Sequence, residues 1–210
     1  MRTKYPRTPH LPWSEGVSSD DVRLLDTANF AGVEVVVTEK MDGENTTLYR
    51  DGSHARSIDS RYHPSRAVIK ALQGQIGWQI PDGWRICGEN LYARHSICYH
   101  NLPDYFMVFS VWDEHNRCLS WDDTQIFAQR LGLTVVPELY RGPWHETLIR
   151  QLPLDTQTQE GYVVRRADAF AFADFANSMG KWVRKGHVNT DKHWMHAEMI
   201  VNGLGGQDEH

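Results

Sequence analysis

The sequence has few of the features that mark secreted, membrane-bound or zinc-binding proteins. Its three cysteines are odd in number and contain no Cys-x-x-Cys pair, which argues against a zinc ribbon and favours a reducing compartment. No apolar run reaches the length of a membrane span, and residues 1–13 alternate basic residues and prolines without the apolar segment of a signal peptide. We therefore expect a cytoplasmic protein that makes no contact with a membrane.

An excess of positive charge is also lacking. The 22 lysines and arginines stand against 27 aspartates and glutamates, which gives a formal net charge of −5. A surface with this balance does not attract nucleic acid as a whole, so any such contact must be local. Only 9 prolines and 16 glycines occur among 210 residues that are 40% hydrophobic, which favours one domain, residues 1–210, with a full core.

What the sequence does have is a lysine at the end of an apolar run. Val33 and Val35 to Val37 predict a largely buried strand, and Asp42-Gly43 predicts the turn that stops it. Lys40 therefore stands where the strand meets the turn. Partial burial disfavours the charged form of an amine and so favours a nucleophilic lysine. The same residues also fit an edge-strand lysine before a hairpin, since Asp-Gly is a common hairpin turn.

The patterns along the chain predict an α+β fold of antiparallel strands with three or four covering helices. We expect a polar lead-in with a short helix at 19–30, and then a meander of three antiparallel strands around Lys40. The first predicted strand begins at Val33. Further strands are predicted at residues 46–50, 55–58, 84–90, 105–112, 135–139, 161–165 and 181–183. The other predicted helices cover residues 64–79, 120–131 and 143–152.

The hexapeptide from Lys40 to Asn45, KMDGEN, resembles the first motif of the covalent nucleotidyltransferases, Lys-x-Asp-Gly-x-Asn. This superfamily contains DNA ligases, RNA ligases and mRNA capping enzymes. The preceding Thr38-Glu39 makes the segment most similar to the RNA ligase 2 class. The resemblance implies the α+β, ATP-grasp-like nucleotidyltransferase fold, a lysine that becomes covalently linked to AMP, and a nucleotide-binding role for Glu39.

Two later segments resemble motifs that hold the nucleotide. Ala55-Arg56-Ser57 resembles the second motif, in which an arginine reaches the phosphates, although Arg61 competes with Arg56 for that role. Gly88-Glu89 resembles the motif whose carboxylate accepts hydrogen bonds from a ribose hydroxyl. Phe109 stands where the superfamily has an aromatic ring stacked on the purine. Taken alone, Phe109 fits the apolar core and the arginines fit exposed strand positions.

Two further segments resemble motifs that act on the phosphates. Glu160-Gly161 resembles the fourth motif, whose glutamate serves the divalent metal. Lys181-Trp-Val-Arg184-Lys185 resembles the fifth motif, a strand whose cations address the α-phosphate. The sequence departs from the usual Lys-x-Lys pattern here, because valine occupies the third position. This leaves Arg184 or Lys185 to supply the second cation, unless these charges are simply solvated.

The resemblance implies an ATP-dependent RNA ligase that works with Mg²⁺ or Mn²⁺. The amine of Lys40 would attack the ATP α-phosphate, with Glu160 and Lys181 as the other catalytic residues. AMP would pass to an RNA 5′-phosphate, and an RNA 3′-hydroxyl would then expel it. We expect burial and the nearby cations to destabilise charged Lys40, Asn45 to contact a phosphate, and Asp42 to shape the turn.

RNA contacts are the least specified part of this interpretation. Arg61, Arg66 and Lys70 could touch an RNA backbone or form the wet face of a helix, and Lys185 is a further candidate for RNA. The histidines at 187, 193 and 196, with Asp191, match no zinc spacing, so we expect no metal site among them.

Only 29 residues follow Lys181 (210 minus 181), too few for an appended oligonucleotide-binding domain. The sequence therefore resembles a bare catalytic core, to which a separate protein could hold the RNA. Two alternatives stay open, a GTP-dependent guanylyltransferase of the capping type and a non-catalytic module that binds nucleotides or RNA ends.

Overall fold

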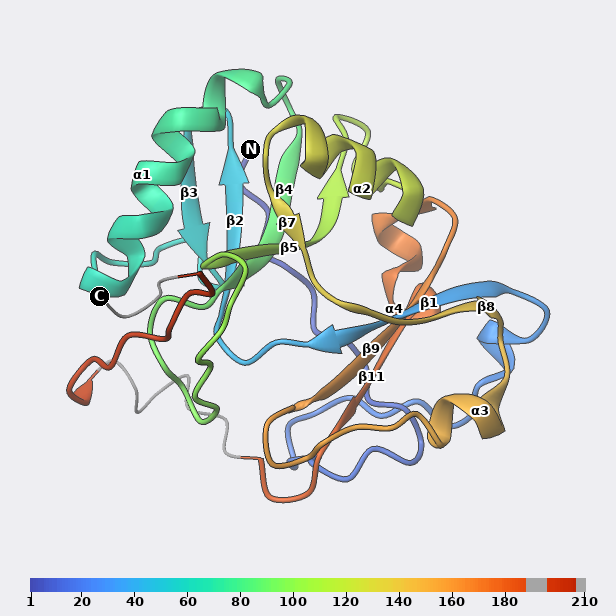
Figure 1. The fold of residues 1–210 in the computed structure, drawn as a ribbon. Helices are drawn as coiled ribbons and strands as arrows, with labels where there is room; N and C mark the ends of the chain where they lie inside the picture. The colour runs from blue at the N-terminus through green and yellow to red at the C-terminus, as the bar shows by residue number, and fades with distance from the viewer. Residues whose placement is uncertain (188–195, 207–210) are drawn as a thin grey trace.

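The computed structural model describes residues 1–187 and 196–206, which form two sheets with helices around them (Figure 1). Sheet A has four antiparallel strands in the order β11-β9-β1-β8. Sheet B has the order β10-β6-β5-β4-β2-β3, and β7 pairs in parallel with β5. The strands of sheet A are β1 (Glu34–Lys40), β8 (Glu138–Pro143), β9 (Gly161–Arg166) and β11 (Met179–Val183). Those of sheet B are β2 (Glu44–Tyr49), β3 (Gly52–Ala55), β4 (Arg85–Asn90), β5 (Phe106–Trp112), β6 (Arg117–Cys118), β7 (Thr134–Val135) and β10 (Phe170–Ala171).

Helices α1 (Ala67–Ile76) and α2 (Trp121–Arg130) cover one face of sheet B, and α3 (Glu146–Arg150) lies against sheet A (Figure 1). The short α4 (Phe175–Ser178) leads into β11. The side chain of Ser120 accepts a hydrogen bond from the amide of Asp123 and so caps α2, as its sequence predicts. Single 3-10 turns occupy Ala28–Phe30, Pro64–Arg66, Gly77–Gln79 and Phe172–Asp174. The predicted α+β class is confirmed, and no helix in the described residues is long and apolar enough to cross a membrane.

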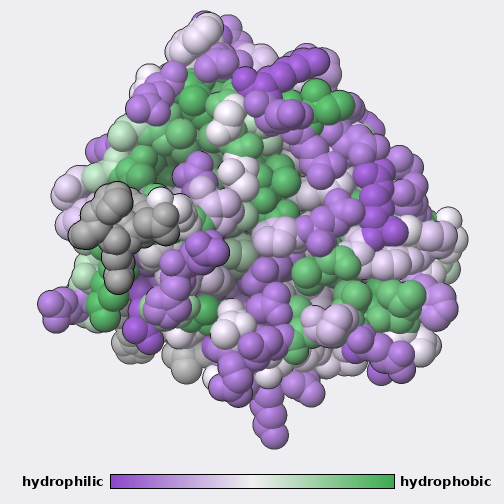
Figure 2. All heavy atoms as spheres, in the orientation of Figure 1, coloured by the Kyte–Doolittle hydropathy of each residue, from purple (hydrophilic) through white to green (hydrophobic). Residues whose placement is uncertain are grey.

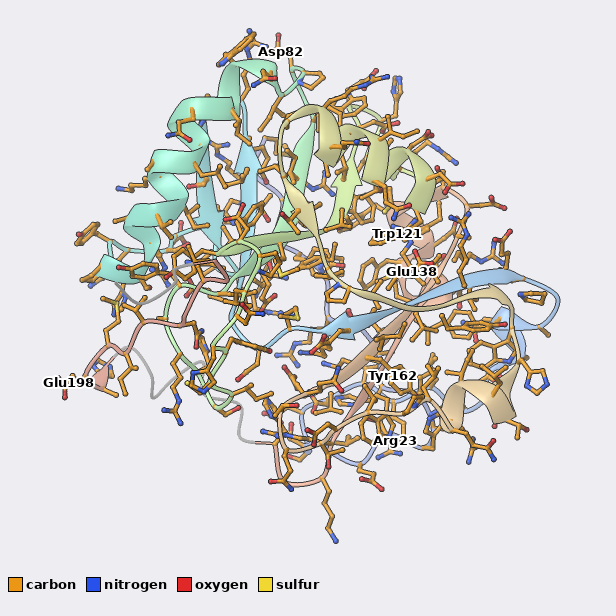
Figure 3. All side chains as sticks on the ribbon, viewed as in Figure 1. Arg23, Asp82, Trp121, Glu138, Tyr162 and Glu198 are labelled. Atoms are coloured by element: carbon orange, nitrogen blue, oxygen red, sulfur yellow. The ribbon has the colours of Figure 1, made fainter. Side chains whose placement is uncertain are left out.

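An apolar cluster joins the two sheets. It combines Val36 of β1, Met107 of β5 and the fully buried Trp121 of α2. The indole of Trp121 also donates a hydrogen bond of 2.9 Å to Glu138 of β8 (Figure 3). Val35 and Val37, which point to the opposite face of β1, pack instead on the N-terminal segment and on Ile149 of α3. Both faces of β1 are therefore buried, as its run of valines predicts. The face seen in Figure 2 is mostly hydrophilic, with hydrophobic residues gathered near α3 and beside α1.

The meander predicted around Lys40 is wrong. Strand β1 pairs with β8 and β9 in sheet A, whereas β2 and β3 pair with each other in sheet B. The Asp42-Gly43 segment therefore carries the chain from one sheet to the other and makes no hairpin. Gly43 is needed there because a Cβ atom would lie 2.4 Å from the carbonyl oxygen of Asn90.

Two other predicted elements also differ. The expected helix at 19–30 is reduced to the turn Ala28–Phe30, because the main chain of this segment bonds to its neighbours: the amide of His10 donates to Val22 and that of Leu24 to His10. The single strand expected at 135–139 is divided between β7 and β8, and Pro137, which has no amide hydrogen, lies between them. The helix expected at 143–152 is shortened to α3, while that expected at 64–79 is confirmed as α1 with flanking 3-10 turns.

Candidate active site

Strand register brings the predicted catalytic residues together. Lys40 pairs with Gly161 across β1 and β9, so Glu160, directly before β9, lies beside the lysine. The Nζ atom of Lys40 donates to Oε1 of Glu160 at 2.6 Å. On the other side of β9, Lys181 pairs with Val163. A Cβ atom on Gly161 would lie 1.9 Å from a carbonyl oxygen of β11, so this close approach of strands requires glycine.

The electrostatics of the two lysines differ from our expectation for Lys40. Burial acts to lower the pKa of Lys40, but the carboxylates of Glu160, Glu89 and Asp42 outweigh it and raise that pKa above its usual value. The predicted destabilisation of charged Lys40 is thus wrong for this state of the protein. Burial and the nearby Lys40 instead lower the pKa of Lys181 to about 8.

Asp42 does more than shape a turn. Its Oδ2 atom accepts hydrogen bonds from the amide and hydroxyl of Ser96, both at 2.9 Å, and from the amide of Ile97 at 2.7 Å. Burial acts to raise the pKa of Asp42, but hydrogen bonds from His187 and Ile97 outweigh this and lower it to about 2. Asp42 is therefore a buried carboxylate that stays charged at neutral pH.

The loop that binds Asp42 is held in turn by residues near the C-terminus. Asn202, only 2% exposed, accepts from the amide of Tyr99 at 3.0 Å and donates to the carbonyl of Leu91 at 2.8 Å. The hydroxyl of Tyr99 accepts from the amide of Asp42 at 2.9 Å. Residues 196–206 thus support the geometry of the site, although no sequence motif indicates this.

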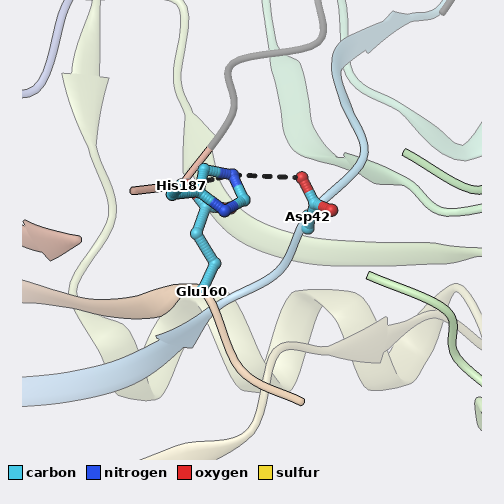
Figure 4. Close-up of side chains that lie close together, drawn as sticks. All are labelled: Asp42, Glu160 and His187. Atoms are coloured by element: carbon cyan, nitrogen blue, oxygen red, sulfur yellow. Dashed lines mark ion pairs between the residues drawn. The ribbon is translucent and has the colours of Figure 1, made fainter. Parts of the chain in front are cut away.

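His187 completes a cluster of possible metal ligands (Figure 4). Its Nε2 atom lies 3.5 Å from Oδ1 of Asp42 and 3.5 Å from Oε1 of Glu160. One ligand atom from each of the three residues lies within 4.8 Å of the others. Glu160 was predicted to serve a metal. Asp42 and His187 were not, because they are 145 positions apart (187 minus 42) and only the fold unites them. His196 is exposed, and positions 191 and 193 fall outside the described residues.

The predicted nucleotide-binding residues Glu39, Asn45, Glu89 and Phe109 lie on strands β1, β2, β4 and β5. Asn45 of β2 pairs with Glu89 of β4, and Glu89 accepts from the amide of Gly43 at 3.1 Å. The buried Oδ1 atom of Asn45 has no hydrogen-bond partner among residues 1–187 and 196–206. Phe109 is half-buried and meets the ring of Tyr5 edge-on, with centroids 5.2 Å apart. Burial raises the pKa of Glu39, whose side chain bonds to Gln159.

The predicted cations divide into those near the site and those engaged elsewhere. Arg56 is close enough to Lys181 to help lower its pKa. Arg184 donates to the carbonyl of Thr156 at 2.6 Å and to Nδ1 of His187 at 3.3 Å. Arg66 is bound to both carboxylate oxygens of Glu44, at 2.7 and 2.6 Å, which gives it a role within the fold. Of the cations predicted to contact nucleotide or RNA, the exposed ones are Arg61, Lys70 and Lys185.

Most of this site lies inside a segment that matches a known family. The model of the RNA ligase family matches residues 33–183, which include Lys40, Asp42, Glu160 and Lys181. The chain belongs to the RNA ligase family. His187 lies four positions beyond the matched segment (187 minus 183). A search of curated proteins finds no match.

Solved RNA ligases share the fold. A mutant of the Naegleria gruberi RNA ligase with ATP and Mn is 17% identical with a TM-score of 0.54, and the same ligase with PPi is 19% identical with a TM-score of 0.55. An archaeal ATP-dependent RNA ligase is 17% identical with a TM-score of 0.58. Each match covers 86% of this chain but only 60%, 57% and 48% of the respective ligase. The nucleotidyltransferase fold expected from the sequence is thus confirmed.

Proposed function

We propose that this member of the RNA ligase family is an ATP-dependent RNA ligase that forms a lysyl-AMP on Lys40. The observation that carries the proposal is the position of Lys40, whose amine contacts Glu160 at 2.6 Å beside the strand that holds Lys181. A lysine kept only for solubility would not be gathered with a buried glutamate and a second, largely buried lysine. Family membership supports a ligase, and the ATP complex of the Naegleria enzyme supports ATP as the nucleotide.

In the proposed first step, the neutral amine of Lys40 attacks the α-phosphorus of ATP. A nitrogen–phosphorus bond forms, the bond from the α-phosphorus to the oxygen that bridges to the β-phosphate breaks, pyrophosphate leaves, and the attacking nitrogen transfers one of its two protons to water. Lys181 and Arg56 would stabilise negative charge on the phosphates. Arg56 is the better candidate of the two arginines because its charge acts on Lys181, whereas Arg61 is exposed.

The residues also fit the divalent cation that the family implies. Asp42 and Glu160 are both under 10% exposed, and buried carboxylates are normally paired or bound to metal. The chemistry that a bound Mg²⁺ or Mn²⁺ supplies is neutralisation of charge on the transferring phosphate. The buried Oδ1 atom of Asn45 lacks a hydrogen-bond partner within the described part of the chain, while its amide nitrogen suits a phosphate or ribose contact.

The RNA steps follow from the same proposal. AMP would pass from Lys40 to an RNA 5′-phosphate, and an RNA 3′-hydroxyl would expel it. We propose that the exposed Arg61 and Lys185 contact the RNA. Arg66 is a poorer candidate than the sequence suggested, because its guanidinium is paired with Glu44. We further propose that residues 1–210 act as one catalytic domain in the cytoplasm and that a separate protein binds the RNA for it.

A labelling experiment tests the first step. The protein is incubated with [α-³²P]ATP or [α-³²P]GTP and Mg²⁺ or Mn²⁺, and then resolved by denaturing electrophoresis. We expect an acid-labile adenylate on the wild type that is absent from Lys40→Ala and unchanged in Lys70→Ala, in which an exposed lysine is removed. A guanylate instead would indicate a capping-type enzyme, and no adduct with either nucleotide would indicate a binding module. Sealing of nicked RNA duplexes and of single strands then tests the later steps.

A further inference from the structure

His187 is the one member of the Asp42–Glu160–His187 cluster that the family match leaves out. We propose that His187 is a direct nitrogen ligand, so that the cluster prefers a transition-metal ion such as Mn²⁺ to Mg²⁺. The inference rests on the proposed function for the presence of a metal near Glu160, and it adds the identity of a ligand and of the ion.

The distances fit coordination by three protein groups. Two ligand atoms that bind one ion at about 2.1 Å lie about 3.0–3.4 Å apart for angles between 90° and 109°. The Nε2 atom of His187 lies 3.5 Å from an oxygen of Asp42 and 3.5 Å from an oxygen of Glu160. Small side-chain movements therefore suffice to bring all three to a common ion.

The hydrogen bonds of Asp42 leave the appropriate oxygen for this role. Its Oδ2 atom takes the three bonds from Ser96 and Ile97, whereas Oδ1 is the oxygen that faces His187. In Glu160 the oxygen that faces His187, Oε1, is also the one that accepts from Lys40 at 2.6 Å, so an ion there would use the second lone pair of this oxygen. Both carboxylates are thus placed with an oxygen toward the imidazole.

The outer side of the imidazole is also supported. Its Nδ1 atom lies 3.4 Å from the hydroxyl of Ser96, and that hydroxyl donates to Asp42. In this structure Nδ1 also accepts from Nε of Arg184 at 3.3 Å, so binding of an ion to Nε2 would require the proton of the neutral imidazole to move from Nε2 to Nδ1, where a hydrogen bond to the Ser96 oxygen replaces the one from Arg184. Ligating histidines commonly bond through their second nitrogen in this way, which fixes the ring and the tautomer.

The donor set decides which ion is preferred. Mg²⁺ favours oxygen ligands and retains several waters, whereas imidazole favours first-row transition ions. In a site with two carboxylates and one imidazole, the histidine therefore increases the affinity for Mn²⁺ more than the affinity for Mg²⁺. Removing the imidazole should weaken Mn²⁺ binding and leave Mg²⁺ binding nearly unchanged.

The test measures metal binding to the nucleotide-free protein. Free Mn²⁺ is followed by electron paramagnetic resonance during titration, and Mg²⁺ affinity is obtained by competition. We expect His187→Ala to weaken Mn²⁺ binding at least about tenfold and Mg²⁺ binding less than about threefold. His187→Gln, which offers an oxygen, should likewise lose the preference for Mn²⁺. His115→Ala, which removes a histidine that is 75% exposed, is the matched control and should bind as the wild type does.

A second measurement needs no variant. Pulsed electron paramagnetic resonance of Mn²⁺ bound to the wild type should show coupling to an imidazole nitrogen. Absence of this coupling, or equal Mn²⁺ affinity in wild type and His187→Ala, overturns the inference. Adenylation is assayed separately: nitrogen coupling without a lysyl-AMP would refute the proposed function alone, and a lysyl-AMP without coupling would refute the histidine ligand alone.

Discussion

Replacing Glu160 by glutamine should make the amine of Lys40 more reactive in the absence of nucleotide. Glu160 is the nearest anion to Lys40, at 2.6 Å, and its side chain is only 6% exposed. Glutamine keeps the size and one acceptor oxygen but removes the charge. The charged form of Lys40 then loses its main partner while Lys181 stays close by.

The size of the effect follows from the bond that is lost. A hydrogen bond to a charged group contributes about 1.5–3 kcal/mol, and about 1.4 kcal/mol corresponds to a factor of ten. The side chain of Lys40 is 26% exposed, so solvent screens part of its attraction to Glu160 and the effect should lie at the lower end of this range. We therefore expect the fraction of neutral Lys40 amine near pH 7.5 to rise about tenfold.

Trace acetylation measures that fraction. Wild type and Glu160→Gln are treated with limiting acetic anhydride, and mass spectrometry compares acetylation of Lys40 with that of the exposed Lys70. Glu39→Gln is the matched control, because it removes a carboxylate whose side chain projects from the opposite face of β1. If Lys40 is acetylated no faster in Glu160→Gln than in wild type, the ion pair does not control the charge of the lysine.

Three further predictions concern stability. Asn202→Ala removes the side-chain partners of one buried and one partly buried main-chain group and should lower the free energy of unfolding in urea by about 2–4 kcal/mol, whereas the exposed Asn177→Ala should change it little. Gly43→Ala should cost about 1–3 kcal/mol because its methyl group meets a carbonyl at 2.4 Å, whereas Gly74→Ala, in open space on α1, should stabilise by up to about 1 kcal/mol. Burial lowers the pKa of His10 to about 4, so as the pH falls below about 6.5 the unfolded chain takes up a proton first and stability is lost down to about pH 4. His10 should accordingly contribute up to about 3 kcal/mol to the loss of stability of the wild type between pH 7 and pH 4, and His10→Asn should lose that much less over the same range; equal losses would contradict the assignment.

The sequence predicts the parts of the fold that depend on local pattern. The valines of β1, the apolar run of β5 and the cap at Ser120 all form the elements they indicate. Three motif residues, Lys40, Glu160 and Lys181, come together because each lies on or next to a strand of sheet A. Strand register, once the fold is given, accounts for their approach.

The sequence does not predict which strands pair. Asp42-Gly43 carries the same signal for a hairpin as for a chain that crosses between sheets, and only contacts with Asn90 and with Ile97 distinguish the two. The sequence likewise does not predict that His187 and Asn202 take part in the site. Both act through contacts with residues far away in the sequence, which periodicity and motif spacing do not report.

The charge on Lys40 shows how burial alone misleads. Burial does lower the pKa of a lysine, and it dominates for Lys181, but three carboxylates reverse the result at Lys40. An amine held as an ammonium has no lone pair with which to attack phosphorus. If Lys40 is the nucleophile, Glu160 must therefore give up its bond to Lys40, or accept the proton, before the attack. The oxygen of Glu160 that bonds to Lys40 also lies 3.5 Å from Nε2 of His187, so a cation bound on that side would compete with Lys40 for this oxygen and favour the neutral amine.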